Sequence, residues 1–260
     1  MLRPRIIPCL LVKDKGLVKT VKFDKPKYVG DPINAVRIFN EKQVDELMVL
    51  DIDATTSSME PDLKMIENLA NECRMPLCYG GGIKTLDQAK KIFSLGVEKI
   101  AISSAAVDDL SFVTKISQQV GTQSVVVVID IKKNKLGGYS IYTHNGRRLS
   151  SEEPLKFAEK AERAGAGEIV INSIDNDGMM NGYDIGIITK IRKEVSLPMT
   201  VLGGAGSIED IGKLIHSFGI IGAAAGSLFV FKGVYKAVLI NYPDQIIKDE
   251  LIVKNLLSDC

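Results

Sequence analysis

Short apolar runs rich in β-branched residues alternate with longer amphipathic stretches along the whole chain. This alternation is typical of repeated strand–helix units whose strands lie parallel in one sheet. Eight such runs are present, and they cover residues 5–12, 46–52, 76–80, 99–103, 124–130, 168–174, 198–204 and 220–226. Amphipathic helices are predicted between them, for example over residues 31–43, 85–96, 151–165 and 207–219. Eight strand and helix pairs in 260 residues predict an α/β fold, a closed (β/α)₈ TIM barrel, ahead of a doubly wound open sheet.

The two halves of the chain resemble each other. YGGGIKTLDQA at the third run parallels LGGAGSIEDI at the seventh, and AISSAAV at the fourth parallels AAAGSLF at the eighth. The repeat spans half the chain, so we predict an internal half-barrel duplication within a single domain over residues 1–260. Two longer connections follow the first and fifth runs, and connections of that length are usually lids, binding loops or small hairpins.

The charge balance excludes several classes of partner. Lysine plus arginine (33) nearly equals aspartate plus glutamate (32), so no overall field draws the chain to nucleic acid or to a membrane. The first apolar run is broken by Pro8 and lacks a signal-peptide cleavage site, which predicts a cytoplasmic protein. The four cysteines have no metal-ligand spacing, so we expect reduced thiols and predict neither a metal nor another cofactor.

Glycine-rich strand ends predict two phosphate sites. Backbone N–H groups exposed where a strand leads into a helix suit an anion. One candidate cradle comprises Gly80, Gly81, Gly82, Ser103 and Ser104, and the other comprises Gly203, Gly204, Gly206, Gly226 and Ser227. Glycines also serve tight turns that bind nothing, but two matched clusters favour a phosphorylated small molecule with an anionic group at each end.

Several segments carry a resemblance to a known family over essentially the whole chain, namely RIIPCL, DELMVLDI, GGGI, VVVVIDIK, RAGAGEI, SIDNDG and GGAGS. With them the chain resembles the cyclase subunit of imidazole glycerol phosphate synthase. The resemblance implies a (β/α)₈ barrel that receives ammonia from a glutaminase subunit docked at its N-terminal face and acts on a bis-phosphate substrate. It also implies substrate or phosphate contacts by Lys19, Asp51, Asp177 and Gly178.

One catalytic residue of that family is absent. Two aspartates, at the ends of the first and fifth strands, do the acid–base work in the family, and Asp130 matches the second of them. Where the family reads CLDVK, residues 9–13 of this chain read CLLVK. Leu11 therefore stands where the family has its first-strand aspartate. Side chains alternate along a strand, so Leu11 is expected to point into the barrel with Arg5 and Ile7. Loss of a positioned acid or base typically slows a reaction by about 10²–10⁴-fold, so ring closure should be much slower than in the family.

Four charged residues start four different strands, and the resemblance implies that they form an ammonia gate. They are Arg5, Glu46, Lys99 and Glu168. A structural plug at the barrel floor is the alternative, although buried ion pairs contribute little net stability. Above them, Ile7, Cys9, Val126 and Val128 should leave an apolar path for an uncharged molecule.

Three functions remain open at this point. The residue at position 11 and the loop KFDKPKYVGDP resemble a branch linked to acetamidino modification of sugars in bacterial surface polysaccharides, where ammonia passes to a separate sugar amidotransferase. The second hypothesis is an ordinary cyclase and lyase of histidine biosynthesis. The third is a phosphosugar-binding scaffold without chemistry, which Asp130 and Lys19 oppose.

Overall fold

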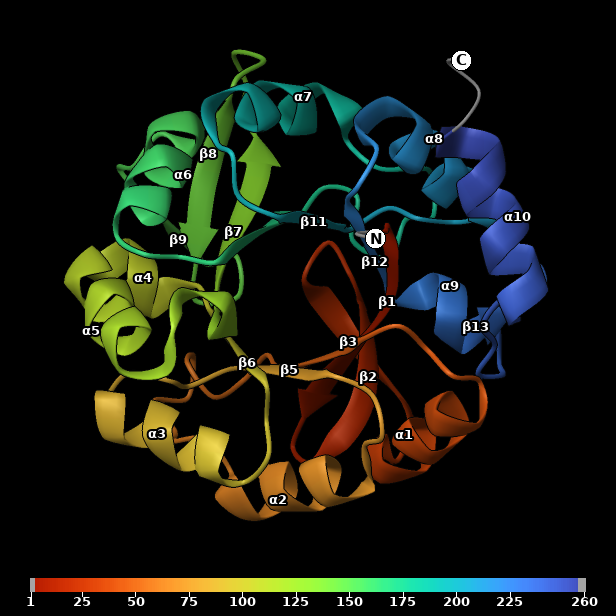
Figure 1. The fold of residues 1–260 in the computed structure, drawn as a ribbon, viewed down its shortest axis with the longest axis horizontal. Coiled ribbons are helices and arrows are strands. Elements are labelled where there is room, and N and C mark those ends of the chain that lie inside the picture. The colour runs from red at the N-terminus through yellow and green to blue at the C-terminus, as the bar shows by residue number, and fades with distance from the viewer. Residues whose placement is uncertain (1–2, 257–260) are drawn as a thin grey trace.

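Eight parallel strands close into a barrel in the computed structural model, which describes residues 3–256 (Figure 1). In the order in which they pair, the strands are β10 (Glu168–Ser173), β11 (Met199–Leu202), β12 (Gly222–Ala225), β1 (Arg5–Lys13), β4 (Leu47–Asp51), β5 (Leu77–Gly80), β6 (Lys99–Ile102) and β7 (Val125–Lys133). Strand β7 also pairs with β10, and this contact closes the ring. Each of the eight predicted runs contains or overlaps one barrel strand, so the predicted (β/α)₈ fold is confirmed.

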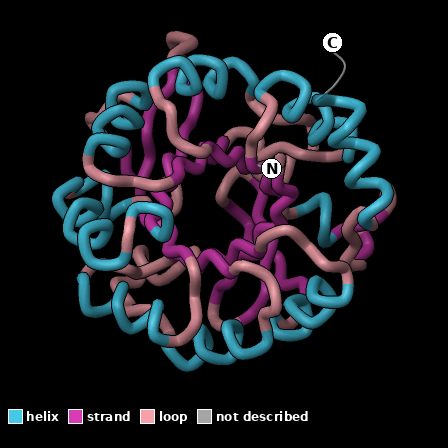
Figure 2. Tube along the Cα trace, viewed as in Figure 1, coloured by secondary structure: helices cyan, strands magenta, loops and turns pink. Residues whose placement is uncertain are grey.

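Helices surround the barrel, as Figure 2 shows. They are α1 (Pro32–Glu41), α2 (Leu63–Glu72), α3 (Leu86–Ser94), α4 (Ser104–Asp108), α5 (Leu110–Val120), α6 (Pro154–Arg163), α7 (Ile185–Glu194), α8 (Ile208–Phe218), α9 (Ser227–Val230) and α10 (Gln245–Leu256), with a 3₁₀ turn at Thr122–Ser124. Helices α3 and α8 occupy equivalent places in the two halves and start alike. Thr85 and Gln88 form a capping box at α3, and Ser207 and Asp210 form one at α8.

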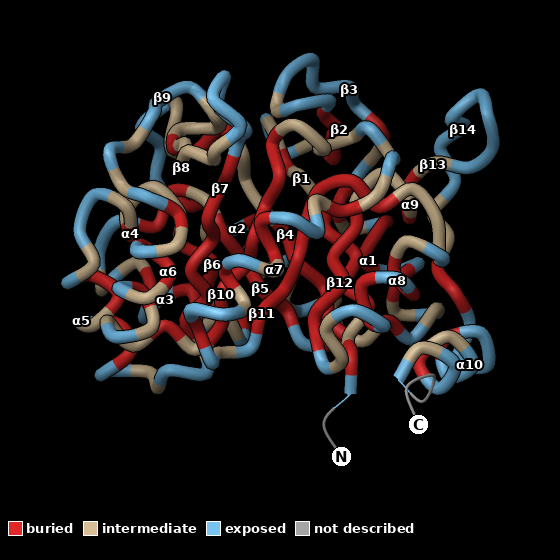
Figure 3. Tube along the Cα trace, turned by 90° about the horizontal axis from the view of Figure 1, so that it is seen from above, coloured by how far each residue is buried: buried red, intermediate tan, exposed pale blue. Residues whose placement is uncertain are grey.

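The two long connections fold as small antiparallel extensions of the barrel sheet. The first forms β2 (Gly16–Val21) and β3 (Asp24–Gly30), and the second forms β8 (Tyr139–Thr143) and β9 (Arg148–Leu149). A further hairpin of β13 (Phe231–Lys232) and β14 (Ala237–Val238) was not predicted. All three lie on the face where the barrel strands end, as Figure 3 shows. They therefore surround the mouth of the barrel.

The core divides into two apolar clusters. The larger lies between the strands and the surrounding helices, as expected for strands buried on both faces. The smaller fills the barrel itself and comprises Ile7, Cys9, Met48, Cys78, Ala101, Val126, Val128, Val170, Leu202 and Ala224. The four residues predicted to form the apolar path, Ile7, Cys9, Val126 and Val128, belong to it. Full burial of a side chain of the Val or Leu class contributes about 1.5–3 kcal/mol.

The cysteines within the described residues are free thiols, at positions 9, 73 and 78. Cys260 lies outside the described residues. No helix among residues 3–256 combines the length and the apolar character needed to cross a bilayer.

Candidate functional site

A pocket opens at the mouth of the barrel, and it brings the predicted site residues together. It is lined by both glycine clusters, by Ser103, Ser104 and Ser227, and by the charged residues Lys19, Asp51, Asp130 and Asp177. Gly206 belongs to the second predicted cradle but does not line the pocket. The four predicted gate residues lie at the other end of the barrel. Residues from both halves of the chain therefore meet at one site.

Two glycines in each cradle adopt positive φ angles. The φ angles are +122° at Gly81 and +72° at Gly82, and +93° at Gly203 and +114° at Gly204. Side chains would also collide there, since a Cβ at Gly81 would lie 2.4 Å from the Asp51 carbonyl oxygen. Backbone geometry alone therefore requires glycine at these turns. The same turns leave the pocket wall without side chains, where an anion would meet backbone groups.

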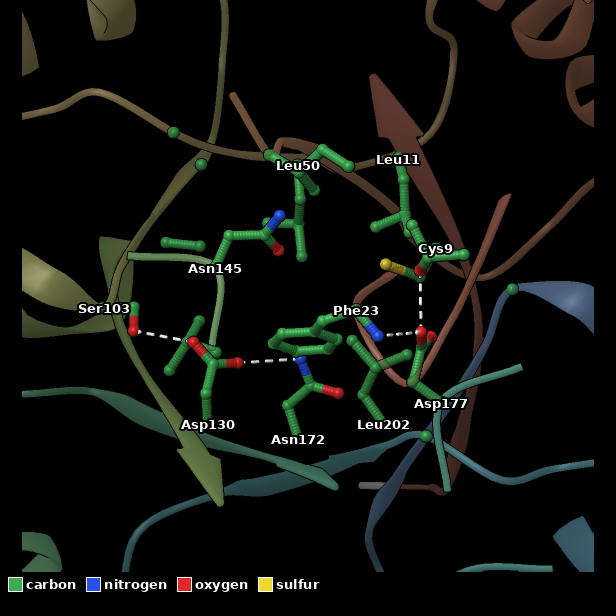
Figure 4. Close-up of a pocket in the computed structure, with 18 of the residues that line it drawn as sticks. Cys9, Leu11, Phe23, Leu50, Ser103, Asp130, Asn145, Asn172, Asp177 and Leu202 are labelled. Carbon is green, nitrogen blue, oxygen red and sulfur yellow. Dashed lines mark hydrogen bonds between the residues drawn. The ribbon is translucent and has the colours of Figure 1, made fainter. Parts of the chain in front are cut away.

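Asp130 is held by two hydrogen bonds in the pocket (Figure 4). Ser103 Oγ donates to Asp130 Oδ2 at 2.9 Å, and Asn172 Nδ2 donates to Asp130 Oδ1 at 2.8 Å. Burial opposes the charged form more strongly than these bonds favour it, and it raises the pKa of Asp130 to about 6. The carboxyl can therefore accept or release a proton near neutral pH.

Leu11 stands across the pocket from Asp130, next to Leu50 (Figure 4). The two leucines are register partners on β1 and β4, and both pack against the apolar cluster inside the barrel. Asp14 lies exposed just beyond β1. The Cys9 side chain also lines the pocket, but burial raises the pKa of its thiol to about 12. The wall opposite Asp130 is therefore apolar where the family pattern has its first aspartate.

Lys19 lies in β2, within the first of the two long connections, and is buried. Its Nζ donates to the Cys9 carbonyl oxygen at 2.7 Å and lies beside Gly226 in the second cradle, where a Cβ would come within 2.5 Å of it. Burial lowers the pKa of the Lys19 ammonium. The hairpin therefore places a cation directly at one of the two predicted anion sites.

Asp177 and Gly178 hold the tip of the β2–β3 hairpin. Asp177 Oδ2 accepts hydrogen bonds from Thr20 Oγ1 at 2.7 Å and from the Phe23 backbone N–H at 3.0 Å. Gly178 packs so closely that a Cβ there would lie 2.2 Å from the Thr20 carbonyl oxygen. In Figure 4 the Phe23 ring lies across the middle of the pocket. In this structure the Asp177 carboxylate therefore holds the tip of the β2–β3 hairpin in place.

Asp51 lies at the end of β4, as its match to the family's second-strand carboxylate implied. Its Oδ1 accepts hydrogen bonds from the backbone N–H groups of Asp53 and Ala54, at 3.0 and 3.1 Å. Burial raises the pKa of its carboxyl. The side chain thus shapes the turn after β4 while it lines the pocket.

The four predicted gate residues form a closed ring of ion pairs at the floor of the barrel. Arg5 bridges Glu46 and Glu168, with 2.7 Å from its Nη2 to Glu168 Oε1. Lys99 Nζ bridges the same two carboxylates, at 2.9 Å from each. Burial works against ionisation of Glu168, but Arg5 and Lys99 outweigh it and hold the pKa of that carboxyl at about 2. Opposite charges alternate around the ring, so no free charge is left at its centre.

Two polar residues of the site were missed in the sequence. Thr200 Oγ1 donates to Glu168 Oε1 at 2.5 Å and so joins the floor ring, and Asn172 holds Asp130. Thr200 interrupts the apolar strand β11, and Asn172 follows three consecutive apolar residues of β10. That interruption was the available signal, because a buried polar side chain needs a partner.

The histidines offer no metal site. His144 is half-buried in the turn between β8 and β9, where its Nδ1 lies 3.0 Å from Thr143 Oγ1. Its backbone N–H donates to Ser104 Oγ at 3.1 Å. Within residues 3–256 no group of three His, Cys, Asp or Glu side chains is arranged to hold a metal ion.

Comparison with known proteins gives consistent matches. The model of the histidine biosynthesis protein family matches residues 5–236. A Vibrio vulnificus protein, provisionally named an imidazole glycerol phosphate synthase subunit, is 55% identical over 244 residues, or 94% of each chain. A Leptospira interrogans protein with the same kind of name is 55% identical over 96% of this chain and 99% of its own. Imidazole glycerol phosphate synthase subunit HisF of Natranaerobius thermophilus is 38% identical over 93% of this chain and 96% of its own.

Proposed function

The chain belongs to the histidine biosynthesis protein family, among the HisF-like cyclase subunits of imidazole glycerol phosphate synthase, and on that premise we propose that it is the ammonia-conducting barrel of a glutamine amidotransferase system. A glutaminase subunit binds the floor of the barrel and releases ammonia there. The ammonia passes the ring of Arg5, Glu46, Lys99 and Glu168 and reaches Asp130 at the mouth. The pocket retains the site for a phosphorylated ligand.

The apolar path supports this role. Ile7, Cys9, Val126 and Val128 lie in the cluster inside the barrel, between the charged floor and the pocket. An ammonium ion would lose its hydration among such side chains at a cost of several kcal/mol, whereas neutral ammonia would not. Bulk water would protonate ammonia at neutral pH and so remove its nucleophilic lone pair. An enclosed route keeps it reactive.

Leu11 is the observation that separates this barrel from an ordinary cyclase. The side chain opposite Asp130 cannot exchange a proton, so Asp130 is left to act alone. We propose that the ammonia is passed to a separate sugar amidotransferase, which forms an acetamidino group on an N-acetylated sugar of a bacterial surface polysaccharide. Amidine formation replaces an amide oxygen by nitrogen, so that enzyme must activate the oxygen with a nucleoside triphosphate, and the oxygen leaves as part of the released phosphate or nucleotide.

The test supplies the purified protein with ammonium salt and the bis-phosphate ribulosyl substrate of the synthase. Ring closure should be at least about 10²-fold slower than with an aspartate-bearing cyclase, because the positioned acid or base is absent. Leu11→Asp should restore part of the rate. Turnover of the unmodified protein within tenfold of the aspartate-bearing enzyme would instead establish the ordinary cyclase, the function that the 38% identity to HisF favours.

A further inference from the structure

The tip of the β13–β14 hairpin exposes apolar side chains almost completely. Val234 is 95% exposed and Tyr235 is 96% exposed, and both lie in the turn between the two strands. Val238 and Leu239, just beyond the turn, are about half exposed. Single exposed apolar residues are common, but this hairpin exposes four of them within six positions. The folded chain alone therefore leaves much of this apolar surface in contact with water.

The same rim of the barrel carries an excess of positive charge. Residues 22–28 and 231–239 contain five lysines and one acidic residue, Asp24. The lysines are exposed, and none forms an ion pair with another residue in the range 3–256; they are Lys22, Lys25, Lys27, Lys232 and Lys236. The whole chain has a net charge of only +1. The positive charge is therefore concentrated on this rim.

The two hairpins are continuous with the pocket. Ser227 lines the pocket and begins α9, and β13 follows that helix directly. Lys19 lines the pocket from β2. The hairpins also touch, since Lys27 Nζ lies 5.9 Å from the centroid of the Phe231 ring. Figure 3 shows both hairpins projecting from the face at which the barrel opens. A molecule bound to this rim would cover the mouth.

We propose that this rim docks a partner protein that presents acidic side chains around an apolar recess, and that the partner is the enzyme holding the ammonia acceptor. The inference rests on the proposed function, because ammonia leaving at the mouth must be received before it meets water. Tyr235 and Val234 would fill the recess, since buried aromatic anchors dominate most protein interfaces. The surrounding lysines would steer an acidic partner to the rim.

The test measures the affinity of the barrel, in complex with its glutaminase, for a purified N-acetylsugar amidotransferase from the same organism. Val234→Ser/Tyr235→Ser should weaken binding by at least about tenfold. Leu136→Ser is the matched control, because Leu136 is 97% exposed in the turn between β7 and β8 on the same face. It should leave the affinity within about twofold. Lys232→Glu/Lys236→Glu should mainly slow association and reduce its dependence on salt.

The outcomes separate this inference from the proposed function. If the wild-type mixture amidates the sugar from glutamine while the tip variant binds and works as well as the wild type, the docking surface is wrong and the proposed function stands. If the wild-type mixture neither binds nor amidates, the docking surface and the proposed function are both wrong. Self-association in sedimentation, or binding to phosphatidylglycerol vesicles, would also overturn the proposal if the tip variant abolished it. The occupant would then be a second copy or a membrane.

Discussion

Asp130 and Asn172 are register partners on β7 and β10, and the Asn172 amide donates a 2.8 Å hydrogen bond to the Asp130 carboxylate. Ser103, the residue that follows β6, completes the arrangement by donating to the second carboxylate oxygen. The strand pairing that closes the barrel therefore also orients the proposed catalytic acid. Burial of this group in the pocket raises its pKa, and that shift has a measurable consequence for stability.

Asp130→Asn should stabilise the protein increasingly as the pH rises from about 4 to 6, and by a constant amount at higher pH. The folded pKa of about 6 lies above the ordinary value of 3.8, so the wild type loses stability as the pH rises from 3.8 to about 6 and carries the full penalty at higher pH. The full penalty is about 3 kcal/mol. Urea unfolding at several pH values measures the difference between variant and wild type. Asp109→Asn is the control, since Asp109 is exposed and its pKa is lowered by its bonds to Ser111. A pH-independent difference for Asp130→Asn would contradict the raised pKa.

Asp177→Ala should loosen the β2–β3 hairpin. The substitution removes the acceptor for Thr20 Oγ1 and for the Phe23 N–H, while the backbone bond from the Lys22 N–H to the Asp177 carbonyl oxygen remains. Loss of these bonds to a half-buried carboxylate reduces the free energy of local opening by about 1–3 kcal/mol. Amides of residues 16–30 should then exchange about tenfold faster or more.

Asp175→Ala is the control for the hairpin, because Asp175 accepts from the Lys133 N–H on another strand. It should leave exchange in residues 16–30 unchanged. Equal exchange in the two variants would mean that the hairpin is held by contacts other than the Asp177 carboxylate.

The parts of the structure that could be predicted from the sequence were those with a periodic or repeated signal. The eight barrel strands are apolar runs bounded by turns, and the paired cradles repeat across the two halves. The bond between Thr20 and Asp177 has no such signal, since the two residues are 157 positions apart and become neighbours only when the barrel closes. The resemblance identified Asp177 as a site residue, but its partner came from the structure.

The β13–β14 hairpin lay outside any prediction for a similar reason. Its strands are two residues each, too short for alternation to identify, and its apolar turn residues look like core residues in a sequence. Only the structure shows that Val234 and Tyr235 are exposed.

Thr200→Val should destabilise the protein by about 1.5–3 kcal/mol, because Glu168 loses a short hydrogen bond while valine keeps the shape of threonine. The Thr200 hydroxyl packs closely against Gly222, where a Cβ would collide with it, so the valine methyl takes the place of the hydroxyl beside a residue that has no side chain. Thr189→Val in α7 is the control, since its exposed hydroxyl bonds only the Ile185 carbonyl oxygen of its own helix. That change should stay within about 0.5 kcal/mol. Urea unfolding at pH 7 measures the free energy of unfolding of both variants. Equal losses would contradict the role of Thr200 in the floor ring.

Lys99→Met should uncouple glutamine hydrolysis from amidation. The Lys99 ammonium holds Glu46 and Glu168 together, and without it both carboxylates depend on Arg5 and carry uncompensated charge at the barrel entrance. Breaking such a pair also reduces stability by about 3–5 kcal/mol, so Lys99→Met/Glu46→Gln, which removes one charge of each sign, is measured beside it. The readouts are the affinity for the glutaminase and the glutamine hydrolysed per product formed.

Lys19→Met is the matched control for the floor ring, because it removes a buried ammonium at the opposite end of the barrel. If the glutaminase docks on the floor, both Lys99 variants should bind it more weakly or consume more than one glutamine per product, whereas Lys19→Met should bind it as tightly as the wild type. Hydrogen exchange of the complex gives the independent check. Protection of the first residues of β1, β6 and β10 is expected on docking. Protection of the β2–β3 hairpin with the floor left exposed would contradict conduction through the barrel, because ammonia would then be released on the side where it is used.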